Sequence, residues 1–201
     1  SEMFTVRHNY RHRIFDNYLR EGDGSIVEGS LGHMAINMMD KYGLVPQYAY
    51  SGINYDSPKH DHNELSAYVA ALASVTTERG VLTPESIELQ EALFDIYLGK
   101  LPETFEYNGK EYTPLSFKEY LGLDFSDYVD ITSFTHLPFY EKVLLELPDN
   151  WDNGTMYNVP LEEMIEIIDH ALLNGYTVAW SGDISEPGYV LARDLSILPQ
   201  D

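Results

Sequence analysis

The chain of 201 residues contains no cysteine, and this absence excludes several kinds of chemistry within it. Disulfides, thiolate zinc sites, iron–sulfur clusters and a cysteine nucleophile all require that residue. The sequence also lacks a run of about 18 apolar residues, so no segment is predicted to span a membrane. Its first residues lack the basic stretch and following apolar stretch of a secretory signal peptide.

Positive charge is scarce in this sequence. Only 12 Lys and Arg residues accompany 33 Asp and Glu residues, which gives a formal net charge of −21 at pH 7. A surface of that sign repels a nucleic-acid backbone and an anionic membrane, so we expect neither as the main partner. The hydrophobic fraction of 44% is sufficient for a buried core, and we therefore expect a folded protein.

Hydrophobic spacing and breaker residues predict a mainly helical first part and a mixed second part. The expected helices span about 3–20, 31–42, 62–79, 84–98, 116–121 and 160–174. An Asn108-Gly109 turn indicates a hairpin over 105–112. Further strand character appears at 128–134, 142–147, 176–180 and 189–192, the last with no partner expected later in the chain. The predicted fold class is α+β.

The sequence contains few motifs that could form an active site by themselves. His8 and His12 are four residues apart on a predicted helix, which places both imidazoles on one face. A third ligand from His60, Asp61, His62 or Glu64 would complete a zinc site, although the glutamate of the metalloprotease motif is missing. Histidines on the surface or in helix packing are the simpler interpretation. We expect no metal and no cofactor, and the zinc site is kept as an alternative.

Four segments, in order along the chain, carry a family resemblance. Residues 27–46 read VEGSLGHMAINMMDKYGLVP, and 131–134, 157–162 and 175–183 read ITSF, YNVPLE and GYTVAWSGD. Together they resemble the bleomycin hydrolase and aminopeptidase C family of the papain superfamily. In that family an acid-Gly-Gly segment precedes a helix and a Lys-Tyr-Gly-Val-Val-Pro sequence.

The resemblance implies a papain-like cysteine peptidase fold that is incomplete at both ends. A helical left subdomain with an insertion would span 1–125, and part of the β-rich right subdomain would span 126–201. The family uses an upstream Gln, a Cys at a helix start, and a His and an Asn far downstream. None of these four residues has a match here. The chain has no Cys, and no Gln precedes the matched region, since the Gln residues are Gln47, Gln90 and Gln200.

The expected function is therefore that of a central fragment of a cysteine aminopeptidase, inactive by itself, so no catalytic residue is assigned. A non-catalytic papain-like homologue that serves as a binding or assembly module is the alternative. The resemblance places the substrate-binding backbone of the acid-Gly-Gly segment at Gly29 and Ser30, and Ser181 near the specificity pocket. It implies peptide substrates for the full-length parent and a cytoplasmic location. We also expect the chain to self-associate, because elements that cover its apolar faces in the family are absent.

Overall fold

The computed structural model describes residues 1–26, 29–182, 188–190 and 195–196, the last pair without side chains. Two compact units, Ser1–Met164 and Ile165–Asp201, are each described by themselves. Val27, Glu28 and Asp183 of the family-like segments lie outside the described residues. The predicted boundary between residues 125 and 126 falls within the first unit and stays a prediction.

Four helices come first along the chain and the strands follow from residue 105 onward, a segregation that is typical of an α+β protein. The elements are α1 (Glu2–Leu19), α2 (Gly32–Tyr42), α3 (Asn63–Arg79), α4 (Pro84–Leu98), β1 (Phe105–Tyr107), β2 (Lys110–Tyr112), α5 (Pro114–Leu121), the 3-10 helix η1 (Phe125–Asp127), β3 (Ile131–Thr132), β4 (Glu141–Leu144), β5 (Thr155–Asn158), α6 (Leu161–Leu173), β6 (Tyr189–Val190) and β7 (Leu195–Ser196).

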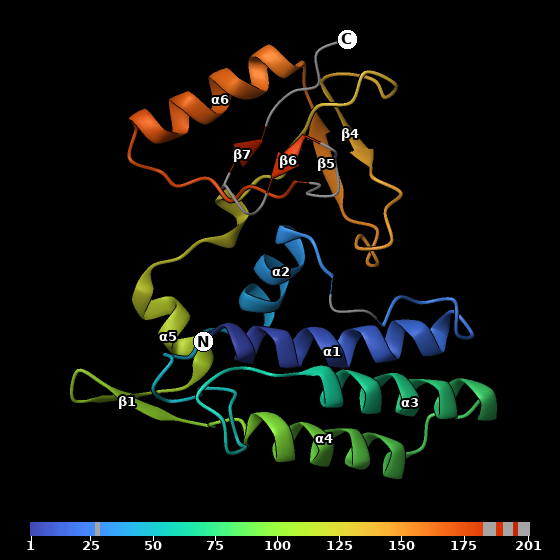
Figure 1. Cartoon of the computed structure of the whole chain (residues 1–201). Helices are drawn as coiled ribbons and strands as arrows, with labels where there is room; N and C mark the ends of the chain where they lie inside the picture. The colour runs from blue at the N-terminus through green and yellow to red at the C-terminus, as the bar shows by residue number, and fades with distance from the viewer. Residues whose placement is uncertain (27–28, 183–187, 191–194, 197–201) are drawn as a thin grey trace. The chain divides into compact units, whose positions relative to one another are not determined.

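Helices α1, α3 and α4 form a layer in the first unit, and α2 packs on α1 from the other side (Figure 1). Between them lies a core of aromatic and aliphatic side chains, including Phe4, Tyr10, Leu65, Val69 and Phe94. The helix ends follow local sequence signals. The Thr83 side chain accepts a hydrogen bond from the Ser86 amide at the start of α4, and Gly80 ends α3 in the left-handed conformation.

The strands of the first unit form two small sheets. In the predicted hairpin, β1 and β2 pair antiparallel around Asn108 and Gly109, both at positive φ. The second sheet has the order β3-β5-β4, with β3 parallel and β4 antiparallel to β5. Strand β5 was not predicted, because it has only four residues and one of its two buried positions is the polar Asn158.

Two sequence predictions in the second unit are wrong. Residues 176–180 form no strand, because no described segment provides their backbone with a pairing partner. Strand β6 does have a later partner: Tyr189 pairs with Ser196 and Val190 with Leu195 of β7. Residues 191 and 192 of the expected strand lie outside the described residues. Among the described residues, no helix is long and apolar enough to cross a membrane.

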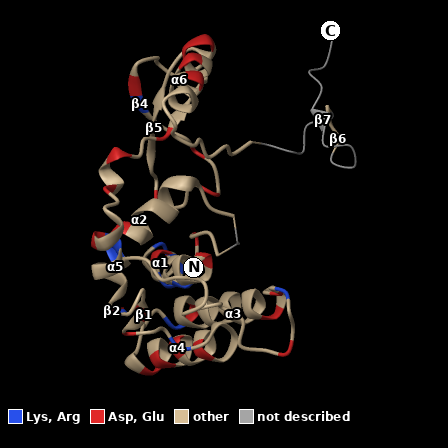
Figure 2. Cartoon of the chain, turned by 90° about the vertical axis from the view of Figure 1, so that its left-hand side faces the viewer, with Lys and Arg blue, Asp and Glu red and all other residues tan. Residues whose placement is uncertain are grey.

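Acidic residues occur on nearly every helix, whereas basic residues are few (Figure 2). Part of the basic charge is used internally. Arg7, which is 2% exposed, donates to Gly99 O at 2.7 Å and pairs with Glu91 and Asp95 of α4 at 2.7 and 2.8 Å. Arg11 also pairs with Glu91. Arg7 and Arg11 therefore join α1 to α4.

Candidate functional site

The segment with Gly29 and Ser30 lies directly before α2 in the first unit. Gly29 is half-buried and Ser30 is exposed. The Ser30 hydroxyl accepts a hydrogen bond from Asn9 Nδ2 of α1 at 3.1 Å and donates to Met34 Sδ of α2 at 2.9 Å. The Ser30 side chain thus fixes this segment to two helices.

The loop between β4 and β5, residues 145–154, lies beside this segment. Its internal shape depends on Asn150, which is 3% exposed. Asn150 Nδ2 donates to Leu145 O at 2.8 Å and to Gly154 O at 2.9 Å, and Asn150 Oδ1 accepts from the Gly154 amide at 3.0 Å. One buried amide side chain therefore closes the loop on itself, as expected for a buried polar group with full hydrogen bonding.

The start of α2 is attached to the same loop through His33. Its Nε2 lies 2.9 Å from Asp152 Oδ1, and its Nδ1 lies 3.0 Å from Asp130 Oδ2, off the hydrogen-bond direction. Gly154 is needed for this approach, because a Cβ there would lie 2.1 Å from His33 Nε2. On the α1 side, Arg20 donates to Trp151 O at 3.2 Å, and the Arg13 guanidinium lies over the Trp151 ring.

These contacts bring Asp149 against Gly29. A Cβ built on Gly29 would lie 2.2 Å from Asp149 Oδ1 and 2.6 Å from its Cγ. The carboxylate therefore occupies the space where any other residue would carry its side chain. The absence of a side chain at position 29 is what permits the contact. The family-like segment points to Gly29, but no sequence signal points to Asp149, since 120 residues separate the two and nothing local marks their contact.

Ser181, the third predicted substrate-binding residue, is exposed and belongs to the second unit. Gly29 and Ser30 belong to the first unit, and each unit is described by itself. The two glycine-segment positions are thus brought together with the 145–154 loop, while the placement of Ser181 near a specificity pocket stays a prediction.

The histidine pair of α1 is used in packing. The His8 ring stacks on Tyr42 at 3.8 Å and meets the edge of Phe4, while His12 Nε2 hydrogen-bonds to Tyr42 Oη at 2.7 Å. Burial and the nearby Arg11 and Arg7 charges lower the pKa of His8 to about 3. No group of three metal-ligating side chains occurs among the described residues. The structure thus gives the zinc alternative no third ligand in this part of the chain.

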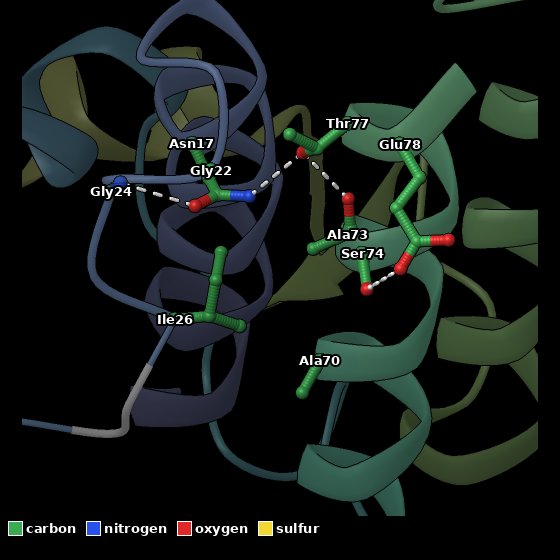
Figure 3. Close-up of a pocket in the computed structure, with 9 residues that line it drawn as sticks. All are labelled: Asn17, Gly22, Gly24, Ile26, Ala70, Ala73, Ser74, Thr77 and Glu78. Atoms are coloured by element: carbon green, nitrogen blue, oxygen red, sulfur yellow. Dashed lines mark hydrogen bonds between the residues drawn. The ribbon is translucent and has the colours of Figure 1, made fainter. Parts of the chain in front are cut away.

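A small open pocket of about 250 Å³ lies between α1 and α3 (Figure 3). Its polar groups already have partners in the protein. Asn17 Nδ2 donates to Thr77 Oγ1 at 3.2 Å, Asn17 Oδ1 accepts from the Gly24 amide at 3.1 Å, and Ser74 donates to Glu78 at 2.9 Å. A ligand would have to compete for each of these groups, so the pocket is weaker than the Gly29 segment as a candidate site.

The fold is that of papain-like aminopeptidases. The crystal structure of PepW from Lactobacillus rhamnosis HN001 superposes on 88% of this chain and 49% of that one, with a TM-score of 0.63 and 16% sequence identity. No family model matches the chain.

Two curated relatives give the same relationship by sequence. Both are from Lactobacillus delbrueckii subsp. lactis: aminopeptidase G is 27% identical over 182 residues and aminopeptidase W 28% over 185 residues. Each alignment covers 78% of this chain and 41% of the relative, so the chain spans less than half of either one's length. These findings confirm the resemblance to the papain-superfamily aminopeptidases.

Proposed function

We propose that this chain forms the central part of a papain-like cysteine aminopeptidase and binds peptide substrate through the backbone at Gly29 and Ser30. The observation that carries the proposal is the similarity to aminopeptidases G and W over 78% of the chain. The arrangement at the segment supports it. Ser30 is fixed to α1 and α2, so its neighbouring backbone is held in place before a peptide arrives.

In this reaction class a thiolate attacks the scissile carbonyl, a histidine moves the proton, and hydrogen-bond donors stabilise the oxyanion. The chain has no cysteine to supply the thiolate. Its own contribution would be orientation: main-chain hydrogen bonds at Gly29 and Ser30 would align an extended peptide, and Ser181 would lie near the side chain that determines specificity. Alignment of this kind contributes to rate only together with the nucleophile.

The second candidate is a papain-like homologue without catalysis that binds peptides or assembles with a partner. The lack of cysteine in all 201 residues is the observation that favours it. Both candidates share the fold and the peptide-binding segment, and they differ in whether a nucleophile is encoded elsewhere in the same protein.

The complete reading frame distinguishes the two. The aminopeptidase proposal expects it to encode a Gln and then a Cys at a helix start before Ser1. It also expects a His on a strand, followed by an Asn, after Asp201. The protein from that frame should hydrolyse aminoacyl fluorogenic amides until its thiol is alkylated, whereas the 201-residue chain should show no turnover. A frame without the Cys, or thiol-independent turnover, would support the non-catalytic homologue or another mechanism.

A further inference from the structure

We propose that Asp149 is a specificity residue that accepts an ammonium group of the peptide bound at Gly29 and Ser30. The inference rests on the proposed function, because it needs a peptide at that segment. It assigns a substrate class to the site: peptides that present a positive charge beside Gly29, from either a free α-amino group or a lysine side chain.

The Asp149 carboxylate lies directly beside Gly29. Both oxygens and Cγ of Asp149 lie within 2.8 Å of the place where a Cβ on Gly29 would stand. A peptide that pairs with the Gly29 backbone must therefore pass directly beside this carboxylate. An ammonium group beside this carboxylate would make a charge-assisted hydrogen bond, which is stronger than a neutral one.

Among the described residues, the oxygens of the Asp149 carboxylate have room to accept further hydrogen bonds. Asp149 is half-buried, and within the part of the chain that the structure describes no donor hydrogen-bonds to it. The Arg13 guanidinium interacts electrostatically with Asp149, but Nε and Nη2 of Arg13 donate their hydrogen bonds to Ser25. A partly desolvated carboxylate without a donor is costly, and a cationic ligand relieves that cost.

The loop of residues 145–154 holds Asp149 in position. The neighbouring Asn150 closes the loop through three hydrogen bonds. Trp151 contacts Arg13 of α1 and Arg20 directly after it, and Asp152 binds His33 of α2. Each of the three residues after Asp149 is thus fixed. Because the loop is already ordered, a ligand that binds Asp149 does not incur the conformational-entropy cost of ordering it.

The test measures peptide binding by the 201-residue chain through the NMR signals of the Gly29 and Ser30 amides. Three probes separate the sources of charge: trialanine amide with a free amino terminus, its N-acetylated form, and N-acetylated alanyl-lysyl-alanine amide. The variant is Asp149→Asn, which keeps the size of the side chain. The matched control is Glu146→Gln, which removes the same charge from an exposed position of the same loop.

We expect at least one charged probe to shift both amides and to bind about three- to tenfold more weakly to Asp149→Asn, with the acetylated trialanine unchanged. The Glu146→Gln control should retain the affinity of the original chain. Which charged probe responds identifies the α-amino group or the lysine as the source. If Asp149→Asn folds poorly, Asp149→Ser removes the same charge and should lose the same preference for the charged probes.

Two results would overturn the inference. The first would retain the proposed peptide site, and the second would remove it. Peptides that shift Gly29 and Ser30 with equal affinity for the original chain and Asp149→Asn would retain the proposed peptide site and remove the role of Asp149. The absence of any shift at these amides with all three probes would remove the peptide site as well.

Discussion

The Asn158 side chain and the Phe134 backbone exchange two hydrogen bonds. Asn158 Oδ1 accepts from the Phe134 amide at 2.7 Å, and Asn158 Nδ2 donates to Phe134 O at 2.9 Å. Nδ2 also donates to the carbonyls of Leu137 and Pro138, both at 3.1 Å. Asn158 is fully buried on β5, so one side chain holds the turn that follows the parallel neighbour β3.

Replacement of Asn158 by Leu should therefore be strongly destabilising. It keeps the approximate volume but leaves buried backbone groups without partners, which should lower the free energy of unfolding by about 3 kcal/mol or more. Urea unfolding followed by circular dichroism measures this change. Asn174→Leu is the control, because Asn174 makes its hydrogen bond to His170 O on the surface and should cost well under half as much. Equal losses in the two variants would contradict the assignment.

This pair also illustrates what the sequence could and could not reveal. The ITSF and YNVPLE segments were recognised by resemblance, and the structure places them on adjacent strands. Local signals were sufficient where the cause is local: Thr83 and Pro84 at the start of α4, and Asn108-Gly109 in the hairpin. Contacts across long separations left no such signal. The Gly29–Asp149 approach does not follow from a sequence pattern. Helix packing was the simpler interpretation of the α1 histidines, but no pattern identified Tyr42 as the partner of His8.

The junction of α1 and α4 gives the second prediction. Glu91 accepts hydrogen bonds from both Arg7 and Arg11, and Arg7 is nearly fully buried. Glu91→Gln should lower the free energy of unfolding by about 1–3 kcal/mol, since a buried guanidinium then has only Asp95 as its charged partner. Chemical denaturation is again the measurement. Asp16→Asn removes an α1 carboxylate that pairs with exposed Arg20 directly after the helix. It should lower the free energy of unfolding by about 0.5 kcal/mol or less. A larger loss from Asp16→Asn would refute the ranking.

The pH dependence of stability should carry a contribution from His8. Its folded-state pKa is lowered to about 3, first by burial and then by Arg11 and Arg7. Between that value and the unfolded pKa of about 6.5 the unfolded chain binds the extra proton. Stability from His8 is thus fully present above about pH 6.5, and it is lost as pH falls, by at most about 1.4 kcal/mol per unit.

His8→Phe keeps a ring against Tyr42 and removes the titrating group, so it should flatten stability between pH 4 and 6.5, a window set by these two pKa values. Unfolding free energies at a series of pH values give the slope. His136→Phe, at an exposed position, is the matched variant and should retain the slope of the original chain. If both substitutions leave the same slope, another group is responsible for it.

Self-association is the last prediction, and it follows from the apolar side chains that remain exposed in the second unit. Ile165, Leu172 and Leu173 of α6, together with Tyr176 and Trp180, are exposed. Large apolar side chains left exposed to water favour association with another molecule. Light scattering after size exclusion should show an apparent mass that rises with protein concentration. Leu172→Glu combined with Leu173→Glu should lower this mass towards that of the monomer, whereas Leu89→Glu, at an exposed position of α4, should not. A single monomeric species at every concentration would instead favour a self-sufficient binding module, because such a module does not need a second copy to cover α6.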